Sequence, residues 1–330
     1  MKGAGLSGVS AVVIAFNTDP AGLSTRLESL SGFAPIVVDN SVDPDHRRRL
    51  RAVAEQSGAT HVDMGGNAGV AVAQNAGMDA AGRDGAARVI LLDDDTAIER
   101  ADVLALADAL DRAQASDGRV AAVGPLLRDE RTGESMWFAR RGRRVRFVRG
   151  EKVASSTVLD AAFLIASGAL IDVVAYQAIG PFRDEYFIDH IDREWGLRGG
   201  TLGRRFVVDP AVVVAHRLGD DPEQIGEEFR YRHSSGLRLY YGTRNSLLLI
   251  RDVRLPLLDR ALEAAFALYV AFGQFAVAEG EGRRRILDGL LDGLRNRRGP
   301  LPETRRQAPV DRPKTPASTS SRSVQEVPHP

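Results

Sequence analysis

The sequence predicts an α/β protein with a Rossmann-like parallel sheet that carries helices on both of its faces. Short apolar runs alternate with helix-like segments through residues 9–92. The runs are rich in Val and Ile and uninterrupted, which is typical of strands covered on both sides. Polar residues follow each run. Because ligands of such sheets bind beyond the carboxyl ends of the strands, these residues mark a ligand crevice.

The elements of this first part follow in a regular order. Strands are expected at residues 9–16, 36–39, 60–64 and 88–92, and helices at residues 21–30, 44–56 and 69–80. Asn17, Asn40 and Asn67 stand just after the first three strands, and an acidic triplet follows the fourth. All four strand ends therefore offer groups that can bind a ligand.

The second part of the chain has a different pattern of apolar and polar residues. Residues 161–171 are apolar, residues 187–198 are expected to turn helical after the first few positions, and residues 206–215 to form a pair of strands. Helices are expected at residues 237–250 and 257–278, and residues 140–152 are strongly basic. Pro, Ser, Thr and charged residues dominate from residue 297, which indicates a disordered tail.

Composition excludes several classes of protein. The 330 residues include no Cys, which excludes disulfides, Cys-ligated zinc, iron–sulfur clusters and thiol nucleophiles, and suits a reducing compartment. Lys+Arg and Asp+Glu both total 44, so no charge excess indicates nucleic acid as the main partner. No signal peptide is expected, because the first apolar run is short and only Lys2 precedes it. The apolar stretch 264–278 falls short of the ~20 residues that a membrane-spanning helix needs.

The acidic triplet is Asp93, Asp94 and Asp95. Two carboxylates separated by one residue on a turn can bind one divalent cation, which prefers oxygen ligands and can neutralise a departing diphosphate. The alternative is a solvated turn in which Asp95 or Thr96 caps a helix that begins near residue 98. The phosphatase pattern Asp-x-Asp-x-Thr after a first strand is not met, because this strand is the fourth and Thr96 follows the second usable carboxylate directly.

A small-residue segment, residues 66–77, is the second signal. Gly66 and Gly69 allow the backbone to approach a ligand closely, and Asn67 and Asn75 can both face the crevice. The alternative is a glycine turn followed by an alanine-rich helix. Neither the Walker pattern nor the dinucleotide Gly-x-Gly-x-x-Gly spacing is present.

Three carboxylates crowd into six residues of the third segment: Asp189, Asp192 and Glu194. If the segment turns helical at Asp189, then Asp189 and Asp192 share one face, and a carboxylate in a partly apolar cleft can act as a general base. The alternative is that these acids lie at the N-terminus of a helix and interact favourably with the helix dipole. His216 follows a predicted strand, and a lone histidine there is structural unless a metal binds nearby.

Taken together, these segments resemble glycosyltransferase family 2, the inverting nucleotide-sugar enzymes of the GT-A fold, and most of all its bacterial rhamnosyltransferase branch. Six motifs carry the resemblance, in order, over about residues 8–250. They lie at 13–17, 38–41, 66–77, 92–95 (Leu-Asp-Asp-Asp), 187–198 and 241–245 (Tyr-Gly-Thr-Arg-Asn).

The resemblance implies a donor site, a metal site and a catalytic base. Asp39 is expected to hydrogen-bond the base of the nucleotide, and the other expected donor residues are Ala15, Phe16, Asn17, Asn67, Asn75, Asp93 and Asp94. The implied metal ligands, for Mg²⁺ or Mn²⁺, are Asp93, Asp95 and His216. Asp192 matches the base, with Asp189 and Glu194 as its neighbours, while Arg244 and Asn245 carry no assigned role. Ala15 stands where the family often has threonine, which affects only the detail of the base pocket.

The implied organisation has five parts: a flexible N-terminus at 1–8, a nucleotide-sugar-binding half at 9–125, an acceptor-binding and catalytic half of the same domain at 126–250, C-terminal helices at 251–298, and a disordered tail at 299–330. The implied activity is inverting transfer of L-rhamnose from dTDP-rhamnose to a hydroxyl of a glycan or a polyprenyl-diphosphate-linked saccharide in cell-wall polysaccharide synthesis. Galactofuranosyl transfer from UDP-galactofuranose and a non-catalytic sugar-nucleotide-binding subunit remain alternatives.

The expected location is the cytoplasm, with peripheral contact to the inner face of the cell membrane. The apolar segment 257–278 and the basic residues around it suit a lipid surface. A core helix with a solvated basic end, or a helix that joins two copies of the chain into a homo-oligomer, is the alternative.

Overall fold

The computed structural model describes residues 8–135, 158–216 and 235–302, and the backbone of short strands at 137–140, 146–149, 223–225 and 228–230. One compact unit spans Met1–Pro300, and Leu301–Pro330 form a second unit. The elements below all belong to the first unit. The side chains of the basic segment 140–152, the first seven residues and the tail from residue 303 lie outside the described residues.

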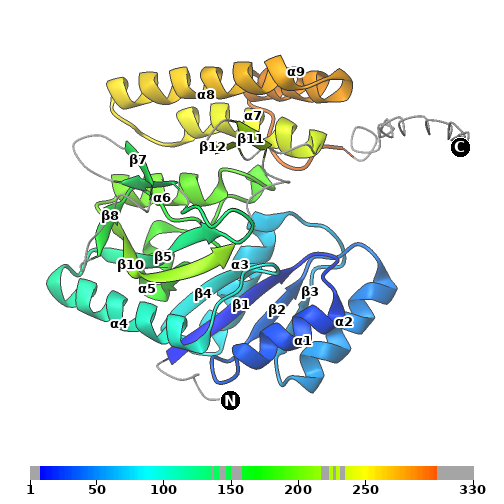
Figure 1. Ribbon diagram of the computed structural model, residues 1–330, viewed down its shortest axis with the longest axis vertical. Helices are drawn as coiled ribbons and strands as arrows, with labels where there is room; N and C mark the ends of the chain where they lie inside the picture. The colour runs from blue at the N-terminus through cyan, green and yellow to red at the C-terminus, as the bar shows by residue number, and fades with distance from the viewer. Residues whose placement is uncertain are drawn as a thin grey trace, which may run out of the picture. The chain divides into compact units, whose positions relative to one another are not determined.

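Among the described residues, a ten-stranded sheet organises this unit, in the order β3-β2-β1-β4-β9-β5-β10-β8-β6-β7 (Figure 1). Its strands are β1 (Val9–Ala15), β2 (Ile36–Asp39), β3 (Thr60–Asp63), β4 (Arg88–Asp93), β5 (Val120–Asp129), β6 (Trp137–Arg140), β7 (Arg146–Arg149), β8 (Leu159–Ala161), β9 (Leu170–Asp172) and β10 (Arg205–His216). A separate two-stranded sheet pairs β11 (Glu223–Ile225) with β12 (Glu228–Arg230).

Strand direction changes in the middle of the large sheet. β1 pairs in parallel with β2 and β4, and β2 with β3. β9 then lies antiparallel between β4 and β5, and β10 runs parallel to β5. The crossovers of the parallel part need helices, as the alternating pattern of the sequence predicts.

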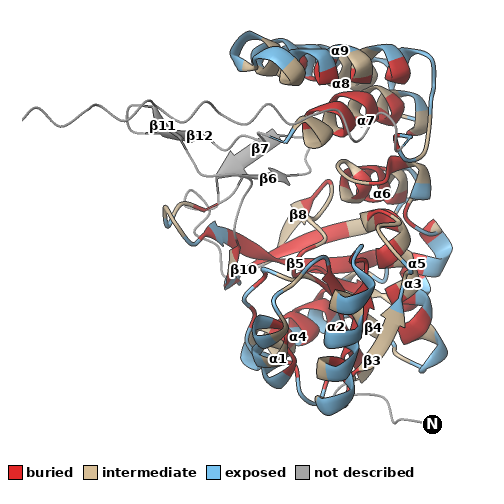
Figure 2. Ribbon diagram, turned by 90° about the vertical axis from the view of Figure 1, so that its right-hand side faces the viewer, coloured by how far each residue is buried: buried red, intermediate tan, exposed pale blue. Residues whose placement is uncertain are grey.

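The helices are α1 (Pro20–Ser29), α2 (Pro44–Gln56), α3 (Val70–Arg83), α4 (Arg100–Ser116), α5 (Val173–Ile179), α6 (Ile191–Thr201), α7 (Gly236–Asp252), α8 (Leu257–Val277) and α9 (Gly280–Leu294), with a 3₁₀ turn at Asp184–Tyr186. Asp19 and Asp43 cap α1 and α2, each with a proline directly after it in the first helical turn. In Figure 2 the helices around the sheet turn buried residues toward the strands and exposed residues outward.

Two apolar cores form on opposite faces of the sheet, because successive residues of a strand point to opposite sides. Val13 of β1 lies in one core, with side chains of α1, α2 and α4. Val12 and Ile14 lie in the other core, with side chains of α3, α5 and α6. All seven residues of β1 are buried, which confirms a strand covered on both faces.

The first six expected elements and the fourth strand are confirmed to within a few residues. One expectation in the second half is wrong: residues 206–215 form a single strand, β10, rather than a pair. Its register against β5 shifts between Asp209 and Val213. A bulge at this point leaves extra residues unpaired and bends the strand without ending it, so the sequence reads as two short runs.

Three helices, α7, α8 and α9, follow the sheet. Gly289 and Gly293 of α9 face α7, where an added Cβ would lie 2.6 Å from the carbonyl oxygen of Tyr240 and 3.0 Å from that of Arg244. Glycine therefore lets the two helix backbones approach closely. α8 is 21 residues long, which is longer than the apolar stretch 264–278 that was judged too short to span a membrane. In the described part of the chain, α8 is the helix whose length and hydropathy would suffice to cross a membrane.

Candidate active site

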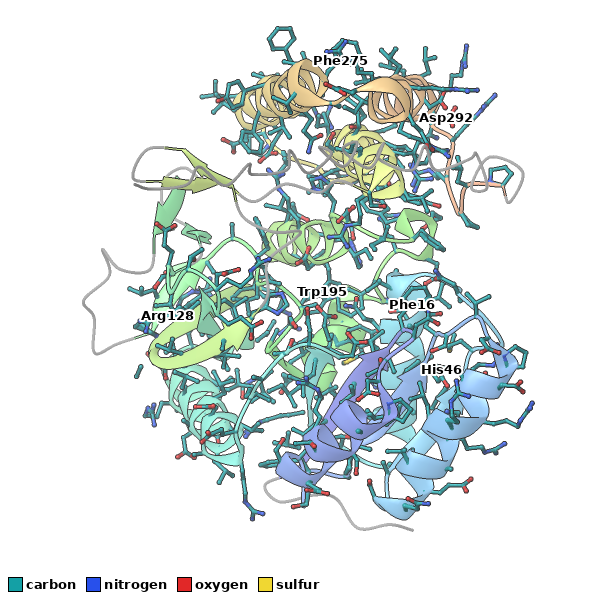
Figure 3. The ribbon with its side chains drawn as sticks, turned by 45° about the vertical axis from the view of Figure 1, so that its right-hand side comes forward. Phe16, His46, Arg128, Trp195, Phe275 and Asp292 are labelled. Atoms are coloured by element: carbon teal, nitrogen blue, oxygen red, sulfur yellow. The ribbon has the colours of Figure 1, made fainter. Side chains whose placement is uncertain are left out.

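A cleft of about 630 Å³ lies beyond the carboxyl ends of β1 and β4. Its walls include Phe16, the acidic triplet, Gly69 at the start of α3, and residues 187–192 that lead into α6. Phe16 stands at the end of β1 and Trp195 in the interior beneath the C-terminal helices (Figure 3). The crevice therefore lies at the sheet edge that the polar strand ends predict.

Two carboxylates and one imidazole converge in this cleft. Single ligand atoms of Asp93, Asp95 and His216 lie within 4.8 Å of one another. Nδ1 of His216 lies 3.6 Å from Oδ1 of Asp95. β4 supplies the first carboxylate and the end of β10 supplies the histidine, so the pairing of β10 with β5 brings residues distant in sequence to one point.

Negative charge is poorly compensated around the triplet. Burial, and then the neighbouring Asp95, raises the pKa of Asp93 to about 6, although His216 opposes this shift. Burial also raises the pKa of Asp95. Carboxylates that are costly to ionise together fit a bound cation, and two carboxylates with one imidazole are a donor set that Mn²⁺ and Mg²⁺ accept.

Asp94 turns to β1 and the loop that follows it. Its Oδ2 accepts a hydrogen bond from the hydroxyl of Thr18 and lies 3.5 Å from the backbone nitrogen of Phe16. Thr96 does not cap the next helix, because its hydroxyl bonds that of Ser167 and approaches His216, while Glu99 is the N-cap of α4. The alternative in which Asp95 or Thr96 caps the next helix is therefore wrong.

Asp189 and Asp192 line the same cleft as the acidic triplet. They do not share a helix face, because α6 begins at Ile191 and Asp189 has a left-handed backbone with φ 66°. Burial raises the pKa of Asp192, against the hydrogen bonds from the backbone of Arg193 and Ala166. Burial raises the pKa of Asp189 to about 6, although Arg238 lies 3.0 Å from its Oδ1.

The loop that presents these aspartates is strained. Phe187, Asp189 and His190 all have positive φ, between 62° and 66°. Non-glycine residues with this backbone persist only where surrounding contacts hold them, at a cost on the order of 1–3 kcal/mol each.

Arg244 and Asn245 of α7 supply those contacts. Nδ2 of Asn245 lies 2.9, 2.7 and 2.9 Å from the carbonyl oxygens of Tyr186, Ile188 and Asp189. Nη2 of Arg244 donates to the carbonyl oxygens of Glu185 and Tyr186. Both side chains are buried. The signature without an assigned role is therefore a clamp on the loop before α6.

The start of α3 holds the other side of the loop. The backbone N–H of Val70 donates to the carbonyl oxygen of Phe187 at 2.6 Å. Gly69 has φ 96°, and an added Cβ would lie 2.6 Å from the ring of Phe187. The glycine predicted to approach a ligand thus approaches this loop closely as well as lining the cleft.

Some of the expected donor residues line the cleft and others do not. Phe16, Asn67, Asp93 and Asp94 line the cleft. Asp39 is fully buried at the end of β2, where it accepts hydrogen bonds from the backbone of Ser41 and approaches His61 at 3.3 Å. Burial alone would raise its pKa, but the hydrogen bonds from His61 and Ser41 outweigh burial and lower it. Ala15 is buried in β1, and Asn17 donates its backbone N–H to Ser41; neither lines the cleft.

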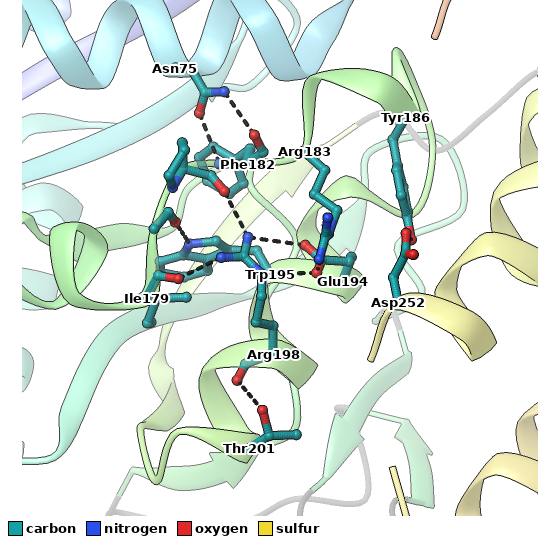
Figure 4. A network of polar contacts seen from close by, with 12 residues as sticks. Asn75, Ile179, Phe182, Arg183, Tyr186, Glu194, Trp195, Arg198, Thr201 and Asp252 are labelled. Atoms are coloured by element: carbon teal, nitrogen blue, oxygen red, sulfur yellow. Dashed lines mark hydrogen bonds and ion pairs between the residues drawn. The ribbon is translucent and has the colours of Figure 1, made fainter. Parts of the chain in front are cut away.

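Two expected site residues serve the scaffold instead (Figure 4). Asn75 was expected to face the crevice. Instead, its side-chain oxygen accepts hydrogen bonds from the hydroxyl of Tyr176 and the backbone N–H of Phe182. Its side-chain nitrogen donates to the carbonyl oxygen of Phe182 and to Asp184, so Asn75 ties α3 to the segment after α5. Glu194, expected beside the base, is fully buried between Arg183 and Arg198, each 2.9 Å from its Oε1. It lies on another side of α6 from Asp192 and does not line the cleft.

The structure adds cleft residues that the sequence did not indicate: Gln74, Ser167 and Arg238. Asn40, one of the polar residues expected at the strand ends, also lines the cleft. Gln74 lies one residue from the predicted Asn75 and was missed because the exact phase of α3 decides which of the two faces the cleft. Ser167 and Arg238 follow no recognisable pattern.

Comparisons with known proteins give the family and the fold of the chain. The family model "Glycosyl transferase family 2" matches residues 10–180. The chain is 26% identical over 297 residues to the dTDP-rhamnosyl transferase RfbF of Shigella flexneri, covering 88% of this chain and 96% of that one.

Two solved structures resemble it in fold. One is S. aureus TarS 1–349 in complex with UDP-GlcNAc, with a TM-score of 0.53, 13% identity, and coverage of 87% of this chain and 80% of that one. The other is the mannosyltransferase PcManGT from Pyrobaculum calidifontis in complex with GDP-Man and Mn²⁺, with a TM-score of 0.51, 14% identity, and coverage of 88% and 87%.

Proposed function

The chain belongs to glycosyl transferase family 2, and from this premise we propose that it transfers L-rhamnose from dTDP-rhamnose to a saccharide hydroxyl with inversion at the anomeric carbon. The glycosyltransferase class and the GT-A fold follow from the family match and from the structures it resembles. The identity of the donor is supported by the similarity to the dTDP-rhamnosyl transferase RfbF along nearly the whole chain.

One observation carries the proposal: a single cleft is lined both by the group Asp93, Asp95 and His216 and by Asp192. The first group would hold Mg²⁺ or Mn²⁺ through two carboxylates and an imidazole. When bound, the cation supplies a positive charge that stabilises the diphosphate as it leaves. Phe16 and Asn67, on the same cleft, are the proposed contacts of the nucleotide.

Asp192 is the proposed general base. It takes the proton of the acceptor hydroxyl while that oxygen forms a bond to the anomeric carbon, and the bond from this carbon to the diphosphate oxygen breaks on the opposite face. Burial supports this role because it raises the pKa of Asp192 toward the working pH. The backbone N–H groups of Arg193 and Ala166 fix the position of the carboxylate.

Attachment to a membrane surface is the second part of the proposal. α8 exposes large apolar side chains along its length, among them Leu268, Tyr269 and Phe272. Arg283 and Arg284 of α9 follow it as exposed cations. Interfacial helices bury such an apolar face in lipid while nearby cations meet anionic headgroups. A lipid-linked saccharide acceptor would be presented at that surface.

A thermal-shift panel tests the donor. We expect dTDP-rhamnose to stabilise the protein in the presence of Mn²⁺, and UDP-galactofuranose, UDP-glucose and GDP-mannose to do so less. Asp95→Ala should remove the Mn²⁺-dependent part of the shift, whereas Asp45→Ala, an exposed acid of α2, should leave it intact. A larger shift with UDP-galactofuranose, or a shift in Asp95→Ala equal to that of the unmodified protein, contradicts the proposal.

A further inference from the structure

A second cavity, here called the side pocket, opens beside the active-site cleft. It has a volume of about 230 Å³ and lies between α6, α7 and α8. Asp189, His190 and Arg238 line both the side pocket and the cleft. A molecule in the side pocket therefore lies against the wall that also presents the proposed base.

The walls of the side pocket combine an apolar strip with polar groups. Phe266, Val270 and Ala271 of α8 form the strip. Opposite them, Oδ2 of Asp189, Nε of Arg193 and Oγ1 of Thr243 are buried without a hydrogen-bond partner. A buried polar atom left without a partner costs about 1–3 kcal/mol, so these three atoms favour a ligand that offers hydrogen bonds.

The charges of the side pocket are compensated in pairs. Arg193 pairs with Glu263 of α8, and Arg238 with Asp189. His190 is neutral, because burial and then the neighbouring Arg193 lower its pKa to about 3. With no surplus of cations among these groups, a neutral ligand suits the side pocket better than a phosphate.

From these observations we propose that the side pocket binds a neutral sugar ring of the acceptor, the ring next to the one that receives the transferred sugar. A sugar ring has an apolar C–H face that can pack on Val270 and Ala271, and hydroxyls that can bond Thr243, Arg193 and Asp189. An alkyl chain would bury those three polar atoms unsatisfied. The volume admits one ring, being smaller than the pockets of larger ligands. The inference rests on the proposed function and narrows its acceptor to a disaccharide or longer glycan.

Acceptor length tests the inference, with release of dTDP from dTDP-rhamnose as the readout. The probes are the methyl glycosides of rhamnose, galactose, glucose and N-acetylglucosamine, and disaccharides that carry each of these as the terminal ring. We expect the best disaccharide to exceed the best monosaccharide at least tenfold in kcat/KM. Val270→Trp, which fills the side pocket, should remove this advantage by raising the KM of the disaccharide.

Val174→Trp is the matched control, because Val174 of α5 is 71% exposed and does not line the side pocket. It should keep the advantage of the disaccharide. Gln274→Ala is a milder change in the same wall and should raise the KM of the disaccharide severalfold even if Val270→Trp folds poorly.

Three outcomes overturn the inference: equal use of the mono- and disaccharides, equal behaviour of Gln274→Ala and Val174→Trp, or no saccharide that stimulates dTDP release although dTDP-rhamnose still shifts the melting temperature. That thermal shift is recorded in every variant. Its absence in the unmodified protein would instead reject the proposed donor, so the two failures are distinguishable.

Discussion

Asp192 combines burial with a position on the wall of an open cleft. Its Oδ1 accepts the backbone N–H of Arg193 at 2.7 Å, which fixes the carboxylate at the first turn of α6. The backbone N–H of Ala166 also hydrogen-bonds this carboxylate. A base that is positioned in this way contributes typically 10²–10⁴-fold to a rate.

Replacing Asp192 by Asn should therefore lower kcat by at least about 100-fold while the Kd for dTDP-rhamnose changes less than about threefold. The amide keeps the shape and the hydrogen bond but cannot take a proton. Single-turnover kinetics and donor titration measure the two quantities. Asp184→Asn, a change in an exposed acid outside the cleft, is the control, and turnover by Asp192→Asn comparable to that of the control would remove Asp192 from this role.

The pH profile follows from the same burial. A base acts when deprotonated, and burial raises the pKa of Asp192 above that of an exposed aspartate. We expect kcat/KM at saturating Mn²⁺ to fall tenfold per pH unit on the acid side, with a midpoint above pH 3.8.

Asp189→Asn separates this titration from that of the neighbour whose pKa lies at about 6. The acid limb should persist in the variant. A limb that disappears with Asp189 would assign the titration, and the role of base, to Asp189.

The sequence predicts the position of a side chain correctly where the residue lies at a strand end. It fails where the rotation of a helix determines whether a side chain faces the cleft. Asp93, Asp95 and His216 converge as the resemblance implies, because strand ends of a sheet lie along one edge. Asn75 and Glu194 face the interior instead, since a rotation of about 100° per residue decides which side of a helix meets the cleft. Three left-handed residues before α6 could not be foreseen, because only the contacts of α7 make that backbone tolerable.

The loop before α6 depends on α7, an element that the chain supplies about fifty residues later. Asn245→Ala should remove the donor to three loop carbonyls and lower kcat by about 10–100-fold, with a smaller change in the KM for dTDP-rhamnose, since the aspartates of the loop would lose their fixed position.

Arg251→Ala, a change in an exposed residue of the same helix, should leave both constants unchanged. A shift in the acid limb of the pH profile of Asn245→Ala would show that the loop itself has moved. Loss of stability with unaltered kcat in the folded fraction would reduce Asn245 to a packing role.

The contact of α3 with the sheet depends on one glycine. An added Cβ at Gly77 would lie 2.3 Å from Cγ1 of Val12 on β1, whereas nothing lies within 4 Å of the same position at Gly82. Gly77→Ala should therefore lower the free energy of unfolding by about 1–3 kcal/mol through overpacking.

Gly82→Ala, in the same helix, should leave stability unchanged or raise it by up to about 1 kcal/mol, because alanine favours the helix. Urea unfolding measures both values. Equal stabilities of the two variants would contradict the close contact of α3 with β1.

The elements themselves were largely predictable, since the period of apolar residues is strong in β1 to β4 and in the long helices. The sheet order was not. β9 is three residues long and is flanked by apolar residues that carry no strand period, and its place between β4 and β5 depends on pairing partners that no local pattern specifies.

At the scale of the whole molecule, the exposed apolar face of α8 is the proposed site of contact with a membrane surface. Changing Leu268, Tyr269 and Phe272 together to Glu, Lys and Glu should abolish flotation with vesicles of phosphatidylglycerol and phosphatidylethanolamine, because the face would lose its apolar contact with lipid. Sedimentation velocity should give a monomer for both proteins.

An exposed change elsewhere, Asp111→Asn on α4, should leave flotation intact. A dimer that the triple change dissociates, together with no flotation of the unmodified protein, would assign the face to a second copy of the chain.

The position of β9 has a consequence for biogenesis. β4 and β5 follow each other along the chain but meet only through β9, which is synthesised after both. Until β9 leaves the ribosome, each of these strands has an edge whose backbone hydrogen-bonding groups are unpaired. Such edges can pair with other chains and cause aggregation. The protein thus has an interval in translation, before β9 leaves the ribosome, during which a chaperone that covers these edges would protect it best.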